Sequence, residues 1–385
     1  MIRILYFSDN HPSLSSFILQ DVNRMSKIHE VCYVYTSQYL KKSNTSFNTK
    51  YIYYPSRSWV SRIKWYLENK SIYLNWYNRL FSGKLNEFIN DFKPTLIHCQ
   101  FAYEGLKLFD NFDDPNISIV INFRGYDASC KLKNPRYVDR LKEILSRENV
   151  HSIFVCNFLK ENLINKGIIF KNKPNIIYTG VDLSKFKIES RKNRITSINP
   201  KKFNIVQTGS FGQKKGHFYT IQAYYKYLRD NPDSDKHLSF IGDGKYLEDM
   251  QNLVKQMGIE KKVSFLGNQK HNFIINALED ADAFIHHSIT AENGDQEGIP
   301  NAIIEAMAMK LPILGSIHSG IPEAIEHGVN GLLCEEKNID SLALQIEQIA
   351  EFKKNEINRE KVKQQFSLDS HIENILNVYR NCLNN

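Results

Sequence analysis

The chain has 385 residues, of which 42% are hydrophobic and 24% charged, so its composition fits a soluble globular protein and its length predicts two domains. Its six cysteines are scattered without a CxxC pair, which disfavours a zinc site or a disulfide framework and favours a reducing, cytoplasmic compartment. The net charge of +8 is unevenly distributed. Residues 1–200 hold 30 Lys and Arg against 17 Asp and Glu, whereas residues 201–385 hold 20 Lys and Arg against 25 Asp and Glu. The first half is therefore expected to prefer anionic partners.

Strand and helix signals alternate in the N-terminal half. The apolar run at residues 117–123 predicts a buried parallel strand, and it ends in Arg124-Gly125-Tyr126-Asp127. The strand predicted at residues 2–7 is followed at once by polar residues, so we expect no signal peptide. No apolar stretch approaches the roughly 20 residues that a membrane span needs. The other predicted elements of this half are strands at residues 31–36, 51–55, 95–100, 152–156 and 175–178, and helices at residues 14–25, 85–92, 102–109, 137–146 and 159–166.

The same alternation restarts near residue 203, after a polar and basic stretch without periodicity. Runs of alternating strands and helices predict parallel sheets with helices on both faces. We therefore predict an α/β fold of two doubly wound Rossmann-like domains, at residues 1–184 and 202–365, joined by a linker at residues 185–201. The predicted elements of the second half are strands at residues 203–207, 238–241, 263–266, 283–286, 311–314 and 331–334, and helices at residues 219–230, 246–257, 274–278, 302–309, 339–352 and 370–383.

Doubly wound sheets bind their ligands at the carboxyl ends of the strands. Arg124 and the loop at residues 8–16 follow predicted strands of the first domain, and are expected at its ligand-binding edge. In the second domain, the features that follow a predicted strand are Gly209, Gly242, Gly267 and the loop that holds Glu297. These are expected to converge on one rim that faces the first domain.

The stretch at residues 290–323 reads as loop, helix, strand, turn and new helix. Pro300 suits the first turn of the helix, where free backbone N–H groups readily bind a phosphate. Glu297 would stand at the mouth of that site, and Glu305, two turns on, would accept hydrogen bonds from a vicinal diol. A phosphate with diols on both sides describes a sugar nucleotide. The alternative is that both are surface carboxylates of an amphipathic helix.

Lys215 lies in the Gly-rich turn that follows the strand at residues 203–207. A lysine at this position would neutralise a diphosphate as a point charge. The alternative is that Lys214 and Lys215 form a solvated end of a loop.

Arg124 follows a buried strand and Asp127 is three residues away. In a site, Arg124 would face the leaving phosphate or the acceptor. The alternative is a structural ion pair between the two side chains.

Aromatic and basic residues are interleaved from Trp59 to Arg79. The pattern is compatible with nucleic-acid stacking, with contact to a membrane surface or with an ordinary amphipathic helix. No nucleic-acid-binding motif accompanies it, so no nucleic acid is expected, and basic residues with Trp and Tyr suit an anionic membrane. His286 and His287 lie at the end of a predicted strand without a third ligand at useful spacing. We therefore predict a structural role, or a minor site role for Ser288, and no metal.

Several motifs occur in the order found in one enzyme family. Residues 297–308 resemble the E-x7-E signature of family-4 retaining glycosyltransferases of GT-B fold, in which two Rossmann-like domains face each other across a cleft. Within that family the chain is most similar to bacterial exopolysaccharide transferases of the colanic-acid type. The other matching segments are Arg124-Gly125-Tyr126-Asp127, Thr179-Gly180-Val181-Asp182 with Phe186, Lys215-Gly216, Ser319-Gly320-Ile321-Pro322-Glu323 and Asn330-Gly331.

The resemblance implies a UDP- or GDP-linked sugar donor, used as a co-substrate without any further cofactor and held by the second domain. The acceptor would bind the first domain, and the final helix, residues 366–385, would cross back to pack there. Glu305 would bind the ribose, and Glu297 the sugar. The implied residues are Glu297, Lys215, Arg124 and Asp127 for catalysis; Glu305, Gly298, Ile299, Pro300, Asn301, Gly209, Ser210, Gly242, Gly267 and Asn268 for the donor; and His11, Ser15 and Ser16 on the acceptor side.

Three positions depart from the family pattern. Ser210 stands where the family usually has Arg, Arg124 where it often has His, and Ser16 where related transferases carry an acid. We predict a metal-independent reaction. The expected function is transfer of a sugar to a lipid-linked or cell-surface glycan at the inner face of the cytoplasmic membrane, where the chain would be peripheral. Because Ser210 removes a cation, the second hypothesis is a catalytically weak partner subunit that binds a nucleotide or a glycan.

Overall fold

The computed structural model describes residues 2–9, 16–36, 47–51, 72–187, 202–354 and 356–384. The chain divides into two compact units. The first comprises Met1–Val155, Lys160–Ile177 and Ile372–Asn385, and the second comprises Cys156–Leu159 and Tyr178–His371. Most of the expected linker, residues 188–201, lies outside the described residues.

The first unit is built on a parallel sheet of seven strands in the order β3-β2-β1-β4-β5-β6-β7. Sequence order reverses between β1 and β4, which makes their carboxyl ends the switch point of the sheet. The predicted alternation is confirmed, although β3 begins earlier than expected and residues 52–55 lie outside the described part of the chain. The strands are β1 (Arg3–Ser8), β2 (Glu30–Tyr35), β3 (Asn48–Tyr51), β4 (Leu96–Cys99), β5 (Ser118–Phe123), β6 (Val150–Phe154) and β7 (Asn175–Ile176).

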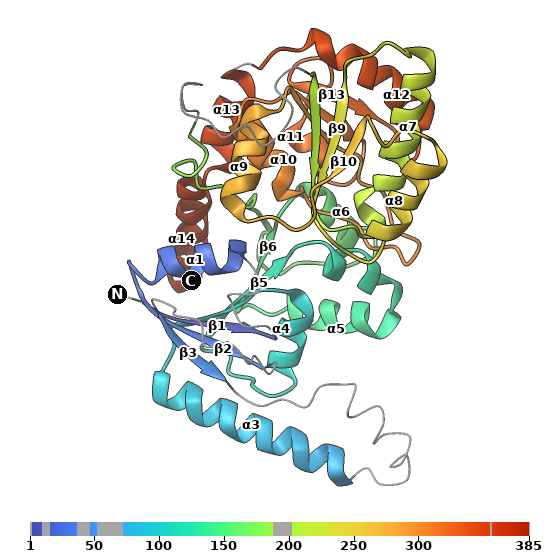
Figure 1. Cartoon of the computed structure of the whole chain (residues 1–385). Coiled ribbons are helices and arrows are strands. Elements are labelled where there is room, and N and C mark those ends of the chain that lie inside the picture. Colours follow the sequence, from blue (N-terminus) through green and yellow to red (C-terminus); the bar gives the residue numbers. More distant parts are fainter. Residues whose placement is uncertain are drawn as a thin grey trace. The chain divides into compact units, whose positions relative to one another are not determined.

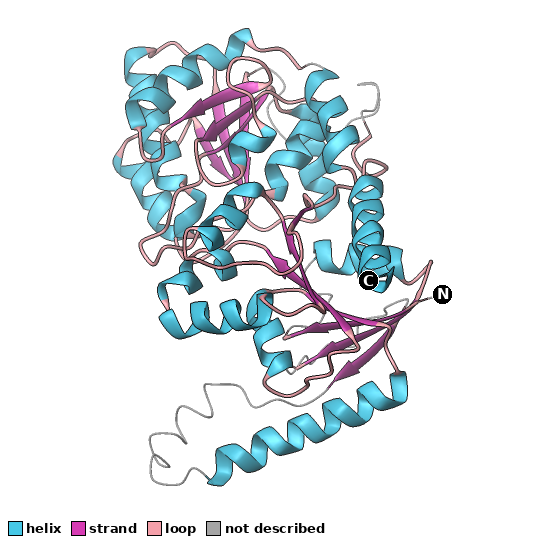
Figure 2. Ribbon diagram, turned by 180° about the vertical axis from the view of Figure 1, so that it is seen from behind, coloured by secondary structure: helices cyan, strands magenta, loops and turns pink. Residues whose placement is uncertain are grey.

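Helices cover both faces of this sheet (Figure 2). In Figure 1, α1 and α14 lie on one side of it, and α3 and α4 on the other. The central strands are buried on both faces and read as continuous apolar runs, as parallel strands do. The helices are α1 (Ser16–Met25), α3 (Ile72–Phe92), α4 (Ala102–Phe109), α5 (Pro135–Leu145), α6 (Asn157–Ile164) and α14 (Leu368–Asn384).

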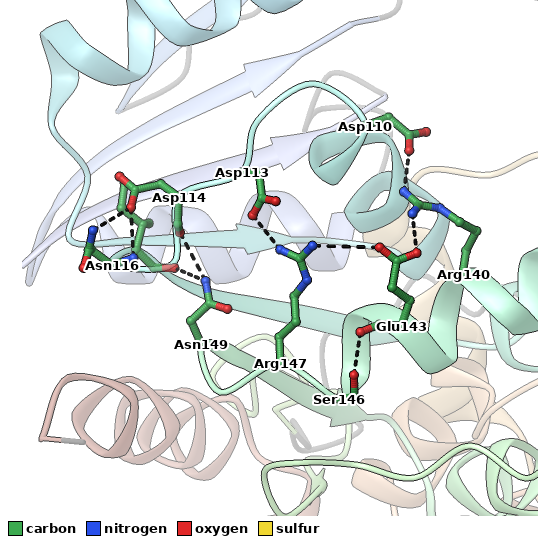
Figure 3. Close-up of polar contacts among 10 residues, drawn as sticks. Asp110, Asp113, Asp114, Asn116, Arg140, Glu143, Ser146, Arg147 and Asn149 are labelled. Atoms are coloured by element: carbon green, nitrogen blue, oxygen red, sulfur yellow. Dashed lines mark hydrogen bonds and ion pairs between the residues drawn. The ribbon is translucent and has the colours of Figure 1, made fainter.

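Ion pairs tie α5 to the loop that follows α4 (Figure 3). Arg140 contacts Asp110 at 2.5 Å and Glu143 at 2.5 Å. Arg147 contacts Asp113 at 2.5 Å, and its guanidinium lies 4.9 Å from the ring centre of Phe109. These contacts fix α5 at the edge of the first unit, next to the turn that follows β5.

The end of α14 is anchored in the core of the first unit. Tyr379 is fully buried, and its hydroxyl lies 3.0 Å from the hydroxyl of Tyr6 and 2.5 Å from Nδ1 of His98. The hydroxyl of Ser118 donates to the carbonyl of Cys382 at 3.0 Å. The last residues of the chain therefore belong to the unit formed by its first residues.

The second unit contains a parallel sheet of six strands in the order β10-β9-β8-β11-β12-β13. Successive residues of a strand point to opposite faces, so Ile205 packs with Leu238 and Tyr224 on one side, and Val206 packs with Phe284 on the other. The strands are β8 (Asn204–Thr208), β9 (His237–Ile241), β10 (Val263–Phe265), β11 (Ala283–His286), β12 (Ile313–Ser316) and β13 (Gly331–Cys334). The helices are α7 (His217–Asp230), α8 (Leu247–Gln256), α9 (His271–Asp280), α10 (Asn301–Ala308), α11 (Ile321–Ala324), α12 (Ile339–Gln348) and α13 (Glu356–Lys361).

Five of the six cysteines are buried, and Cys130 is partly exposed. None of the helices in the described residues combines the length and the apolar character that crossing a bilayer would require.

Candidate active site

Three glycine turns meet at the carboxyl edge of the second sheet. Gly209 follows β8 and donates its N–H to the carbonyl of Ile241 at 3.0 Å, and Gly242 follows β9 and donates to the carbonyl of Gly267 at 2.9 Å. A Cβ on Gly242 would lie 1.9 Å from the carbonyl oxygen of Gly209, so only glycine allows this approach. The exposed residues Ser210 and Asn268 lie in the same turns.

Lys215 meets Glu297 at this edge. The turn Gln213–Lys215 ends at Gly216, which is in the left-handed region with φ of 65°. Nζ of Lys215 lies 2.8 Å from Oε1 of Glu297, and Nζ of Lys214 lies 3.6 Å from the same atom. Burial alone would raise the pKa of Glu297, but Lys215 and Lys214 lower it to about 2, so Glu297 is ionised at neutral pH.

A relay of hydrogen bonds holds the Glu297 backbone. Its N–H donates to Nε2 of His318 at 3.1 Å, and Nδ1 of His318 lies 2.6 Å from Oε1 of Glu336. The other carboxylate oxygen of Glu336 accepts the N–H of Thr290 at 2.7 Å. The hydroxyl of Ser319 donates to the carbonyl of Glu297 at 2.5 Å. Sequence reasoning missed His318 and Glu336, because nothing in their spacing marks them as partners; the only signal was that His318 precedes the Ser319-Gly320 turn.

Glu297, Gly298, Ile299 and Pro300 lead into α10, whose first residue is Asn301. Pro300 has φ of −59° and ψ of 124°, so the backbone leaves the loop and enters the helix at this residue. Glu305 lies on α10, and no hydrogen bond or ion pair of its side chain occurs among the described residues. Burial raises the pKa of Glu305 to about 7, against a smaller effect of Lys185. The buried Glu305 carboxylate can accept hydrogen bonds but has no donor next to it among the described residues. The hydroxyl groups of a ligand would supply such donors.

Asp127 of the first unit holds the backbone of a turn. Its carboxylate accepts the N–H groups of Arg124 at 2.9 Å, Gly125 at 3.0 Å and Ala102 at 3.0 Å. The alternative of an ion pair between the Arg124 and Asp127 side chains was therefore wrong, since the carboxylate is used by N–H groups in a tight turn.

Arg124 directs its guanidinium elsewhere. It donates to the carbonyl oxygen of Gln100 at 3.2 Å and to Oε1 of the same residue at 3.1 Å, and it lies 3.9 Å from the carboxylate of Asp21. It also lies 4.6 Å from the ring centre of Phe17. The side chain is nearly buried, and these contacts place it beside the carboxyl ends of β4 and β5. His11 and Ser15 lie outside the described residues, and Ser16 is the first residue of α1.

A second polar cluster follows β1, and sequence reasoning missed it. Buried Glu104 accepts hydrogen bonds from the hydroxyl of Ser8 and the N–H of Asp9, both at 2.7 Å, and from the N–H of Phe101 at 3.1 Å. Burial and, secondarily, Asp9 raise the pKa of Glu104 to about 8. Lys107 contacts Asp9 in turn. The only sequence signal for this cluster was an acid in the first turn of a helix.

Similarity to known proteins identifies a family. Residues 189–366 match the family model described as glycosyl transferases group 1. This segment, slightly less than half of the chain, belongs to the group 1 glycosyl transferases. A putative colanic acid biosynthesis glycosyltransferase, WcaL of Escherichia coli, is 26% identical over 255 residues, covering 65% of this chain and 61% of that protein. An amylovoran biosynthesis glycosyltransferase, AmsK of Erwinia amylovora, is 33% identical over 171 residues, or 44% of this chain and 40% of that one.

The fold of this group 1 glycosyl transferase recurs in solved structures. HepE of Anabaena, in complex with UDP and glucose, superimposes with a TM-score of 0.74 at 15% identity, over 99% of this chain and 100% of that one. The chain therefore has the predicted GT-B fold. It spans about three fifths or less of the length of the curated relatives described above.

Proposed function

We propose that this group 1 glycosyl transferase is a retaining enzyme that moves a sugar from a nucleoside diphosphate to a glycan acceptor, without a metal. The observation that carries the proposal is the Lys215–Glu297 ion pair at the beginning of α10. Glu305, further along the same helix, has no side-chain partner among the described residues. A cation, a helix N-terminus and two acids suit a phosphate flanked by diols. The UDP and glucose named for HepE support the same ligand class.

The proposed mechanism follows the movement of charge. As the bond between the sugar C1 and the phosphate oxygen breaks, its electron pair stays on the diphosphate. Lys215 and the N–H groups at the beginning of α10 stabilise that charge. In the proposed reaction no protein nucleophile takes part. The acceptor hydroxyl attacks C1 from the side of departure, and its proton passes to the leaving phosphate oxygen.

The acceptor side of the proposal is a cell-surface polysaccharide or a lipid-linked glycan. The names of WcaL and AmsK, which refer to colanic acid and amylovoran biosynthesis, support a polysaccharide. The basic, aromatic sequence from Trp59 to Arg79 supports work at the cytoplasmic face of an anionic membrane, although this sequence lies largely outside the described residues. Co-sedimentation with vesicles that contain or lack an anionic lipid measures this contact.

The test of the activity is a panel of UDP- and GDP-sugars incubated with the purified chain, followed by mass spectrometry of each donor and of the nucleoside diphosphate released. We expect one donor to be consumed and Glu305→Ala to abolish its consumption. Glu347→Ala, which removes an exposed carboxylate on α12, is the control. If Glu305→Ala consumes the donor as fast as the unchanged chain, the assignment of the site is wrong.

The second candidate function is a catalytically weak subunit that binds a nucleotide or a glycan and supports another transferase. Ser210 favours it, because this exposed residue of the turn after β8 carries no charge for a diphosphate. Ser210→Arg adds that charge. If the variant turns over donor faster than the unchanged chain, it supports a weakened enzyme, and if a thermal-shift screen finds no nucleoside diphosphate that binds, the partner subunit is favoured.

A further inference from the structure

His286 is a buried imidazole without hydrogen-bond partners. It is the last residue of β11, its side chain is 0% exposed, and neither Nδ1 nor Nε2 has a hydrogen-bond partner among the described residues. Its neighbour His287, in contrast, accepts the N–H of Lys337 through Nε2 at 3.0 Å. A buried polar group without a partner loses its hydration and gains nothing in return, so such groups in native structures call for an explanation.

The ring of His286 lies at the diphosphate turn. A Cβ built on Gly209 would lie 3.8 Å from Cε1 of His286 and 3.9 Å from Cδ and Cε of Lys215, so the two side chains line the same space beside Gly209. Cε1 is bonded to both ring nitrogens, so the polar edge of the imidazole is the edge nearest to this turn. In the sheet, His286 pairs with Gly315 of β12, which has no side chain to partner it.

The imidazole is neutral in the unliganded chain. Burial, and next the positive charge of Lys215, lower the pKa of His286 well below its usual value. A neutral ring has one N–H donor and one acceptor nitrogen. The ring N–H of His286 lies close to Lys215 in the site proposed for the diphosphate. It is therefore well placed to donate a hydrogen bond to an anionic oxygen. Hydrogen bonds to a charged acceptor are roughly twice as strong as those between neutral groups.

We propose that His286 is a further binding residue for the diphosphate, whose ring N–H donates to an anionic oxygen of the donor beneath Lys215. The inference rests on the proposed function and deepens it. A lysine stem can rotate about several bonds, so the ligand draws the Lys215 ammonium group from Glu297 toward the phosphates, which opens the ring of His286 to a phosphate oxygen. His286 thereby supplies a further donor beside the turn, in which residue 210 is an uncharged serine.

The experiment measures the dissociation constants of UDP, GDP, uridine and guanosine by calorimetry. The variants are His286→Leu, which removes both nitrogens, and His286→Asn and His286→Gln, which keep an N–H donor near Nδ1 or Nε2. The control is His237→Leu, at the beginning of β9 and so at the opposite end of the sheet, where Nε2 lies 2.8 Å from the hydroxyl of Ser264. Circular dichroism checks that each variant is folded.

We expect His286→Leu to weaken binding of the preferred nucleoside diphosphate by about ten-fold or more, and to leave binding of its nucleoside unchanged. One of the two amide variants should recover most of the loss, and His237→Leu should have no effect. Because the nucleoside lacks phosphates, this contrast separates a lost donor from a general disturbance of the site. If His286→Leu does not fold, the two amide variants decide the question by the same contrast.

Two results overturn the inference alone. The first is equal nucleoside diphosphate binding by the unchanged chain and by every folded His286 variant. The second is an equal loss of nucleoside and nucleoside diphosphate binding in those variants, which assigns His286 to packing. If the unchanged chain binds neither UDP nor GDP, both the proposed function and this inference fail.

Discussion

Glu297 and Glu305 are eight residues apart, but their surroundings give them opposite protonation behaviour. Glu297 has two lysines within 4 Å and stays ionised to a pH of about 2. Glu305 has no ion pair within the described part of the chain, and burial raises its pKa to about 7. One acid is therefore permanently charged near neutral pH, and the other is poised to change with pH or with a ligand.

The first residue-scale prediction concerns the pH dependence of nucleoside binding. A ribose diol donates to the ionised form of Glu305, so binding lowers the pKa of this carboxyl from about 7. Affinity should therefore increase as pH rises through 7 and level off above it, by about ten-fold between pH 6 and pH 8 if only the ionised form binds. Calorimetry with uridine and guanosine avoids titration of the phosphates. Glu305→Gln should bind weakly with no pH dependence, and a flat profile for the unchanged chain would contradict the assignment.

The second residue-scale prediction separates the two lysines. Lys215→Ala should slow turnover of the identified donor by at least about 100-fold, because it removes the cation that meets the leaving diphosphate. Lys214→Ala is the matched control, since Lys214 is also paired with Asp295 at 3.1 Å. It should cause a smaller loss. Equal losses in the two variants would argue against a specific role for Lys215.

At the scale of the element, helices in this chain are positioned by contacts at their ends. Asn134 caps α5 by accepting the N–H of Arg136 at 3.0 Å. Ion pairs join Arg140 in the helix and Arg147 just after it to the loop that follows α4 (Figure 3). Exposed ion pairs contribute little, whereas a guanidinium that also packs on an aromatic ring contributes more. Arg140, in α5, and Arg147, two residues after the end of the helix, differ in this respect, because Arg147 lies over Phe109.

The prediction at this scale is therefore a difference in stability. Arg147→Ala should destabilise the chain by about 1–2 kcal/mol, through its ion pair and its aromatic contact together. Arg140→Ala should cost under about 1 kcal/mol, because Arg140 is more exposed. Chemical denaturation, monitored with a probe on the first unit, gives both values. An equal or larger loss for Arg140→Ala would show that the ring contact contributes nothing.

At the scale of the whole molecule, the alternation of strands and helices was readable from the sequence, because parallel strands are apolar on both faces and are separated by amphipathic helices. The convergence of Gly209, Gly242 and Gly267 followed from the geometry of such sheets. The hydrogen-bond partners of individual side chains could not be predicted from the sequence. The side chain of Asp127 bonds backbone groups, and the contact of His318 with Glu336 joins two loops; both depend on atomic positions that residue spacing does not determine.

The prediction at this scale concerns the packing of the C-terminal part of α14 in the first unit. Tyr379→Phe removes a buried hydroxyl that contacts Tyr6 and His98, and should destabilise the first unit by about 1–3 kcal/mol. Removal of residues 372–385 should have a larger effect, because it uncovers the apolar face that this helix buries. Limited proteolysis with mass spectrometry should then find new cleavage sites in the first unit. A cleavage pattern identical to that of the unchanged chain would contradict this role of α14.

The burial of the cysteines has a practical consequence. Burial raises the pKa of Cys32 to about 11 and those of Cys156, Cys334 and Cys382 to about 12, and it also raises that of Cys99. Thiols react with maleimides as thiolates, so these five should be inert in the folded chain. Cys130, partly exposed just after the Asp127 turn, should accept one maleimide dye per chain. The native sequence thus provides a site for a fluorescent reporter just after the Asp127 turn, without cysteine engineering.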